Sequence, residues 1–340
     1  MTEKRYEHLT IEELKLLEER PKSLKGQIWD GIICLLPLVS FGLAIAEYLI
    51  VPNLEGNETT PLYAWFLTAL AGLWGVRLLI GVRTHQGRKD LRYRAPFRTL
   101  VFVLFLLYDY ATLKTGKLPL PYFPWVDQIL NAILKDRAYL FDCTWHSLYL
   151  LFTGYFFGVL SGLLTGIAIG YSKKIDYWLA PFMKLMGAIP GMTWIPLIMI
   201  LASSLFKGAV FVIALGVWYC LAMATATGLR HIDRSYYDAA RILGARGIQL
   251  VTHVALPFAL PNILHGLILG MSSACVSLLA AEMLGVESGL GWYIVWQKSW
   301  AQYAKMYAAI FLLCVIFVVV NWVLAQFKAR MLRWEEGVTN

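Results

Sequence analysis

Charged side chains are scarce in this sequence. They make up 15% of its 340 residues, against roughly 25% in ordinary soluble proteins. Hydrophobic residues make up 59% instead, although about 45–50% is usual. A soluble domain cannot bury that much apolar surface, but the interior of a lipid bilayer accepts it. The composition therefore excludes a soluble enzyme, a disordered tail and a collagen-like chain, and it indicates a membrane protein.

The sequence also lacks the residue patterns of a disulfide framework, a metal centre or a nucleotide site. Its five cysteines form no C-x-x-C pair, and most of them lie in apolar runs. Its histidines do not have the spacing of metal ligands. The phosphate-binding pattern G-x-x-x-x-G-K-[ST] is missing as well. We therefore expect this chain to bind no metal, no cofactor and no ATP, and to have no catalytic site of its own.

Eight apolar runs are about 17 residues or longer, which is enough for a helix to cross a bilayer. The fifth run contains Pro181, Pro190 and Pro196, so we expect a kink or an unwound stretch there. Residues 1–27 are polar, and we expect a cytoplasmic arm followed by a retained membrane anchor. The sequence predicts an all-α polytopic membrane protein. The runs are Ile28–Val51, Leu62–Val82, Phe97–Leu113, Thr144–Tyr171, Trp178–Ser203, Gly208–Gly228, Asn262–Leu284 and Met306–Phe327.

Lysine and arginine are distributed unevenly between the segments that connect these runs. If the N-terminus is cytoplasmic, the inner segments hold 21 of these residues and the outer segments hold 7. Cytoplasmic loops of membrane proteins carry such an excess, so we expect both termini inside. The net charge of +8 then faces anionic lipid headgroups, and nucleic acid is not an expected partner.

Five glycines recur every four residues in the fourth apolar run. Residues at i and i+4 share one face of a helix, and a face without side chains lets a second membrane helix come close. We expect this ridge to be a packing seam between helices. It consists of Gly154, Gly158, Gly162, Gly166 and Gly170.

The inner segment between the sixth and seventh runs has the pattern of a helix, a glycine turn and a second helix. Ser235 is a good helix N-cap, and Asp238 follows where a carboxylate favours the helix dipole. Ala239 and Ala240 leave the helix with a smooth wall, and Gly244 suits a helix C-terminus. The segment therefore predicts a small helix that docks into a groove of a partner.

This segment resembles the EAA loop of ABC importer permeases, whose pattern is E-A-A, three residues, G, nine residues, I, one residue and L-P. Two positions depart conservatively, because Asp238 replaces glutamate and Val254 replaces isoleucine. The resemblance implies that the helix beginning near Ser235 sits in a cleft of an ATPase subunit and couples it to transport. The matching residues are Asp238, Ala239, Ala240, Gly244, Val254, Leu256 and Pro257.

Further stretches are similar to the branch of that family that transports nitrate, sulfonates, taurine and bicarbonate. The resemblance implies a six-span permease domain at residues 96–333, with the coupling loop at 229–261. Residues 28–95 would then be two additional helices with a basic inner loop. The stretches that carry this similarity are Ser147, Ile189–Pro190, Ile195–Leu197, Ala281–Met283 and Ser288–Gly291.

The resemblance implies a permease subunit in a bacterial plasma membrane that imports a small anion of these classes. Its expected partners are a second permease copy or a related chain, two ATPase subunits that bind ATP and magnesium, and an extracytoplasmic solute-binding protein. Irregular backbone at membrane depth is tolerated only inside protein or beside a water-filled path. We therefore expect the translocation path or its gate near Pro190, Pro196 and Glu282.

Two other functions stay open on the residues alone. An ion-coupled secondary transporter working without an ATPase would need intramembrane carboxylates, and Glu282 is the only deep one in the predicted spans. A membrane-embedded enzyme would need a nucleophile–base or metal constellation, and none has the required spacing.

Other acidic and aromatic residues lie near the ends of the spans. Asp30, Glu47 and Asp109 are placed where we expect water to reach them. Three tryptophans of the last outer loop recur every four residues and predict an interfacial aromatic belt or, as the sharper alternative, a docking surface for an external binding protein. They are Trp292, Trp296 and Trp300.

Overall fold

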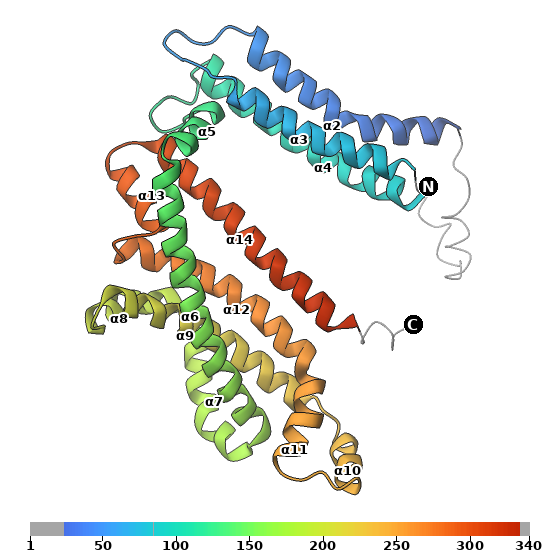
Figure 1. Ribbon diagram of the computed structural model, residues 1–340, viewed down its shortest axis with the longest axis vertical. Coiled ribbons are helices and arrows are strands. Elements are labelled where there is room, and N and C mark those ends of the chain that lie inside the picture. The colour runs from blue at the N-terminus through green and yellow to red at the C-terminus, as the bar shows by residue number, and fades with distance from the viewer. Residues whose placement is uncertain (1–23, 84, 334–340) are drawn as a thin grey trace, which may run out of the picture. The chain divides into compact units, whose positions relative to one another are not determined.

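The computed structural model describes residues 24–83 and 85–333, and these ranges contain helices and no strands. The contacts divide the chain into two compact units, Met1–Leu130 and Asn131–Asn340, here called unit 1 and unit 2 (Figure 1). The predicted cytoplasmic arm, residues 1–27, lies almost wholly outside the described residues.

Unit 1 is built from three long helices. They are α2 (Leu24–Ile50), α3 (Leu62–Gly81) and α4 (His85–Asp109), and α4 continues into a π-helical turn, Tyr110–Lys114. The helix α5 (Val126–Lys135) begins at the end of this unit. The buried side chains that hold the three helices together are Ala44, Tyr48, Tyr63, Leu67, Phe102, Leu113 and Trp125.

The division between the units differs from the predicted boundary between residues 95 and 96. The third predicted span lies in α4 and the π-helical turn that continues it, and α4 packs against both α2 and α3. It therefore belongs to the same compact unit as the two helices that precede it. Hydropathy locates a span along the chain, but it carries no information about which spans pack together.

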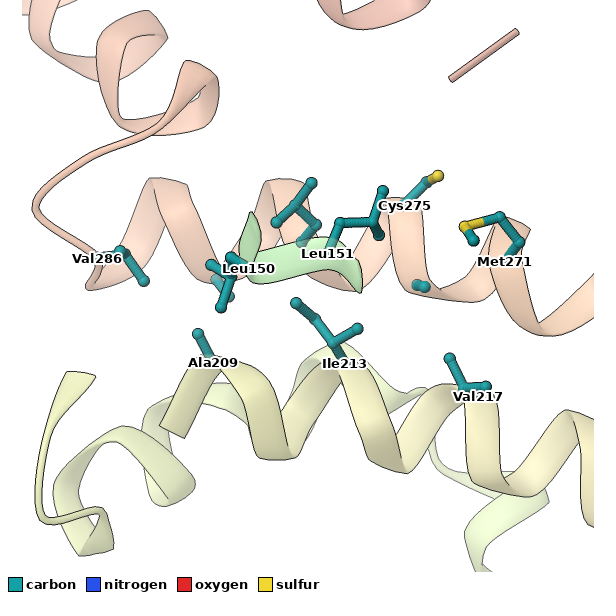
Figure 2. Close-up of a cluster of buried hydrophobic side chains, with 11 residues drawn as sticks. Leu150, Leu151, Ala209, Ile213, Val217, Met271, Cys275 and Val286 are labelled. Carbon is teal, nitrogen blue, oxygen red and sulfur yellow. The ribbon is translucent and has the colours of Figure 1, made fainter. Parts of the chain in front are cut away.

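Unit 2 is organised around three helices, of which α9 contacts both α6 and α12. Figure 2 shows their shared core, where Ile213 and Val217 of α9 point toward α12 and Leu151 of α6 lies beside them; Met271 and Cys275 of α12 belong to the same cluster. The helices of this unit are α6 (Arg137–Tyr171), α7 (Lys173–Ala188), α8 (Ile195–Leu201), α9 (Leu205–Arg230), α10 (Arg234–Ile242), α11 (Ile248–Leu250), α12 (Leu256–Leu284), α13 (Leu290–Ser299) and α14 (Tyr303–Met331).

Within the part of the chain that the structure describes, seven helices are long and apolar enough to cross a membrane, and an eighth candidate is a broken pair. The pair joins α7 to α8 with a bend of 90°. Its break lies at Ile189, whose backbone is extended, because Pro190 disfavours helical geometry at the residue before it. Pro196 stands in the first turn of α8, where a missing N–H is tolerated. The irregular stretch predicted for the fifth run is therefore present, and Pro190 is its origin.

The glycine ridge of α6 lies along the contact with α9. A Cβ atom added at Gly158 would lie 2.6 Å from Val217 Cβ and 2.8 Å from the carbonyl oxygen of Ala214. One added at Gly166 would lie 2.7 Å from Thr225 Cβ. The α9 residues that face the ridge are themselves spaced by four: Ile213, Val217, Leu221, Thr225 and Leu229. A row of side chains on one helix thus fills a groove that glycine leaves on the other.

We predict that Gly158→Ala destabilises the protein, because the new methyl group has no space between α6 and α9. Overpacking of this kind typically costs about 1–3 kcal/mol. The thermal unfolding midpoint of the purified chain in detergent measures the effect. Gly72→Ala on α3 is the matched control, since its Cβ would meet nothing within 4 Å. Equal midpoints for the two variants would contradict the seam.

Candidate functional site

The loop between α9 and α12 carries the helix α10, none of whose residues is buried. Asp233 is the N-cap, because its Oδ1 accepts a hydrogen bond of 2.9 Å from the backbone N–H of Ser235. The prediction of Ser235 as the N-cap is therefore wrong by two residues. Asp238 lies on the exposed surface of α10 and pairs with Arg241 at 2.9 Å.

The helix α10 ends in a tight glycine turn. Gly244 has φ of +91°, a conformation that residues with a Cβ adopt at a cost. Its N–H donates to the carbonyl of Arg241, and the N–H of Ala245 donates to the carbonyl of Ala240, both at 3.0 Å. This pair of bonds is the Schellman motif. Gly247 provides a second positive φ, +55°, so the chain reverses sharply between α10 and α11.

Three apolar side chains project from this turn into solvent. Ile242 is 86% exposed, Leu243 is 88% exposed and Ile248 is 77% exposed. Together they form the apolar tip of the loop. Single exposed apolar residues need no explanation, but a group of them on a rigid, projecting turn is typical of a surface that another protein covers.

Two tyrosines attach α10 to the start of α12. The ring of Tyr236 lies 5.4 Å from that of Phe258, and Tyr237 packs against the buried cluster that contains Ile232 and Ala259. Sequence reasoning missed both tyrosines. The only signal available was their adjacency on a short helix, which does not reveal what they contact.

The second half of the loop returns to the bundle through α11 and a π-helical turn, Val251–Ala255. In this turn the N–H of Leu256 donates to the carbonyl of Val251, five residues back. Pro257 follows in the first turn of α12 and has no N–H to donate. Val254 and Leu256 are partly buried, and Pro257 is exposed, so this second half of the pattern anchors the loop and does not project from it.

Glu282 lies near the end of α12, the helix that follows the loop. Its side chain is buried, and each oxygen accepts one hydrogen bond. Ser147 Oγ of α6 donates to Oε1 at 2.6 Å, and the backbone N–H of Gly291 donates to Oε2 at 2.7 Å. Ser147 Oγ in turn accepts from the N–H of Leu290 at 2.8 Å. A carboxylate at the N-terminus of α13 is electrostatically favourable.

The geometry around Glu282 also explains why glycine occupies positions 289 and 291. Gly289 has φ of +116°, and a Cβ there would run into the Glu282 carboxylate. A Cβ at Gly291 would lie 2.8 Å from Glu282 Cβ. Both glycines are therefore needed for the turn to close over the acid. Pro190 and Pro196 are exposed at the ends of the irregular stretch, and α8 approaches this region through Met199, next to Gly285.

A second polar cluster fastens α13. Asp136 Oδ2 accepts hydrogen bonds from Tyr293 at 2.7 Å and from Lys305 at 2.8 Å. Partial burial raises the pKa of Asp136, but the bonds from Lys305 and Tyr293 outweigh it and the pKa lies below its ordinary value. On the outer face of α13, Trp292 and Trp296 stack with their ring centroids 5.3 Å apart. Trp300 continues the row and is 66% exposed.

The acidic residues expected near water in unit 1 differ from one another. Asp30 forms an ion pair of 2.9 Å with Arg92. Asp109 is completely buried, so the expectation that water reaches it is wrong. The π-helical turn that follows α4 carries the chain onward past Asp109, so the end of the apolar run is not the end of the packed structure.

The part of the chain that contains the loop between α9 and α12 is similar to known proteins. Residues 155–333, just over half of the chain, match the family model described as binding-protein-dependent transport system inner membrane component. The aliphatic sulfonates transport permease SsuC of Bacillus subtilis is 29% identical over 56% of this chain and 69% of its own length. The taurine transport system permease TauC of Escherichia coli is 27% identical over 77% of this chain and 99% of its own length.

A third relative and one solved structure extend this picture. The bicarbonate transport system permease CmpB of Synechococcus elongatus is 29% identical over 53% of this chain and 64% of its own length. An inward-facing form of the MetNI methionine ABC transporter has a chain that is 21% identical, with a TM-score of 0.51, over 58% of this chain and 98% of its own. At that identity the structure shows a shared fold only.

We predict that Glu282→Gln destabilises unit 2, because an amide offers one acceptor oxygen where the carboxylate offers two. One of the donors from Ser147 and Gly291 then loses its partner, which costs about 1–3 kcal/mol. The thermal unfolding midpoint measures this loss, and Glu287→Gln is the control, since Glu287 is exposed. A variant that unfolds like the control but no longer transports would instead assign Glu282 a direct role in transport.

Proposed function

This chain belongs to the family of binding-protein-dependent transport system inner membrane components, and from that premise we propose that the loop from Asp233 to Pro257 couples it to ATPase subunits. The loop is the observation that carries the proposal. None of the residues of its helix α10 is buried, its apolar tip has no partner in this chain among the described residues, and a Schellman turn fixes its shape. A stiff apolar projection is suited to a groove in a partner.

The proposed partners follow from the same premise. Two ATPase subunits would bind ATP and magnesium, since the sequence of this chain holds no phosphate loop. A second permease copy or a related chain would complete the translocation path, and an external binding protein would deliver the solute. Asp238, Ala239 and Ala240 lie on α10 and Gly244 ends it, so the residues that match the EAA pattern are those that shape the projecting half of the loop.

The proposed solute is a small anion. The relatives are named for the transport of aliphatic sulfonates, taurine and bicarbonate, and a negatively charged sulfonate or carbonate group is common to these compounds. We propose the same class for this chain. The path or gate would lie beside the irregular stretch around Pro190 and Pro196, and Glu282 would hold the helices next to it in place.

The proposed orientation places the loop and both termini in the cytoplasm, because Lys and Arg are concentrated in the segments on that side. We further propose that unit 2 holds most of the permease core and that α2 and α3 of unit 1 are the addition to it. The family match lies entirely within unit 2. The match to TauC covers 77% of this chain, which is more than unit 2 contains, and it therefore also includes part of unit 1.

An ion-coupled secondary transporter is not favoured. The relatives are ABC permeases or permease components of transport systems. In addition, both oxygens of Glu282 are occupied by hydrogen-bond donors from α6 and α13. A carboxylate that binds and releases a coupling ion needs an oxygen that the protein leaves open.

We predict that Gly244→Val strongly reduces the amount of ATPase subunit that co-purifies with the tagged chain from its native membrane. A side chain at positive φ costs about 1–2 kcal/mol, so the turn would change shape or binding would weaken by about tenfold. ATP hydrolysis in the eluate and the stoichiometry of the bands measure the effect.

The matched control for this variant is Gly56→Val in the loop between α2 and α3. Gly56 has φ of +89°, Gly244 has φ of +91°, and an added Cβ would meet nothing within 4 Å at either site. The backbone strain is therefore the same, and only the location differs. Equal loss of the ATPase from both variants, or from neither, would refute the proposed coupling loop.

We also predict that Leu243→Asp removes the ATPase subunit without unfolding the chain. Leu243 is 88% exposed, so the charge stays hydrated in the free chain but would be buried at an apolar interface, where it is costly. Leu243→Met keeps the apolar surface and should retain the ATPase. The same co-purification reads out both variants, and equal retention by both would exclude the apolar tip from the interface.

A further inference from the structure

Unit 1 contains a pair of buried carboxyl groups far along the chain from the coupling loop. Asp109, the last residue of α4, has no exposed surface, and both carboxylate oxygens of Glu47 on α2 are buried as well. The two carboxyl groups lie within hydrogen-bonding reach of each other. If both were ionised, both would be acceptors only, and no hydrogen bond would form between them.

No donor among residues 24–83 and 85–333 satisfies these oxygens. All four carboxylate oxygens of Glu47 and Asp109 lack a hydrogen-bond partner. Lys114 is the cation whose charge acts on both. An ammonium group has three N–H donors, and those of Lys114 go to the carbonyl of Tyr48 at 2.9 Å, the carbonyl of Val51 at 2.6 Å and Asn53 Oδ1 at 2.8 Å. Lys114 therefore compensates charge but offers no hydrogen bond.

The other titratable groups around the pair do not supply a donor either. Tyr63 of α3 is completely buried, its hydroxyl has no partner, and it interacts electrostatically with both acids. The hydroxyl of Tyr48 donates to the carbonyl of Thr60 at 2.7 Å. Asp127 of α5 adds a third negative charge near Asp109, but it accepts bonds from the backbone N–H groups of Thr60 and Tyr63.

The carboxyl pair therefore lacks one positive charge, and it lacks a hydrogen-bond donor. Glu47 and Asp109 carry two negative charges when ionised, and Lys114 balances one of them. A buried acceptor without a donor costs about 1–3 kcal/mol, and two adjacent carboxylates cannot both stay ionised without further compensation. A single proton removes one charge and turns one acceptor into a donor to the other.

We propose that Glu47 and Asp109 form a proton-binding site in unit 1, in which one proton is shared between the two carboxyl groups at neutral pH. A metal ion fits less well, because hard cations such as Ca²⁺ take about six to eight oxygen ligands. No group of three or more potential ligands among His, Cys, Asp and Glu occurs in the described part of the chain. The site would tie α2 to α4, and it interacts electrostatically with Tyr63 on α3.

The site makes the stability of the protein depend on pH in a defined direction. In the unfolded chain both carboxyl groups ionise near their ordinary pKa values of about 4, so at neutral pH the folded chain binds one proton more than the unfolded chain. Stability then falls as pH rises through the release of that proton. The loss lies above the pH range in which ordinary carboxylates titrate.

The test is infrared difference spectroscopy of the full-length chain in membranes, where a protonated carboxyl group gives a carbonyl band that shifts in D₂O. We expect the wild-type chain to show this band at pH 7 and to lose it at alkaline pH. Subtracting the spectrum of Asp109→Asn or of Glu47→Gln should leave the same band, because each variant removes the shared proton. Glu58→Gln is the control, since Glu58 is exposed in the loop before α3.

A second measurement covers the case in which a variant folds poorly. The thermal midpoint of the wild-type chain should fall between neutral and alkaline pH, whereas that of Asp109→Asn should stay level, because its amide is a permanent donor. Three results would overturn the proposal: a band that persists in both variants, a wild-type midpoint that is level with pH, or a band that appears only when sodium is replaced by choline. The last result would assign the pair to a metal cation.

Discussion

The close contact between α6 and α9 is the constraint on which the rest of unit 2 depends. Apolar side chains gain little by exchanging lipid for another helix, so membrane helices associate through tight packing and through hydrogen bonds. Five glycines clear one face of α6, and an equally spaced row of larger residues on α9 fills the cleared groove. This contact fixes the position of α9 and of everything that α9 carries.

The helix α9 leads at one end into the loop that contains α10, and it packs along its length against α12. Arg230, its last residue, pairs with Asp176 of α7, and Tyr236 and Tyr237 attach α10 to α12. The helix α12 then runs to Glu282, which holds the start of α13. Packed elements therefore connect the loop to the opposite end of unit 2 without interruption. Movement imposed on α10 by a partner has a physical route to that end.

Features that depend on local backbone chemistry could be predicted from the sequence. The break at Pro190 and the end of α10 at Gly244 follow from what proline and glycine do to the chain at their own positions. The spacing of the five glycines places them on one face of α6, but nothing in the spacing identifies α9 as the helix that covers it. The N-cap of α10 was ambiguous, because Asp233 and Ser235 are equally suitable residue types two positions apart.

Features that depend on which helices pack together could not be predicted in this way. Hydropathy placed the third span correctly along the chain, but it gave no sign that α4 belongs with α2 and α3. The burial of Asp109 was not predicted for the same reason. Its position at the end of an apolar run suggested water nearby, whereas its burial is set by neighbours that come from other helices of unit 1 and from the turn beyond α4.

Glu282 and Asp109 show how the supply of donors decides the state of a buried acid. Both side chains are buried in helices long enough to span a membrane. Glu282 receives one donor at each oxygen, from a serine and from the first turn of a helix, so the acid becomes a structural link between these elements. Asp109 faces Glu47 and receives no donor. The same chemical group therefore fixes two helices in unit 2 by accepting hydrogen bonds, and in unit 1 it can do so only by holding a proton.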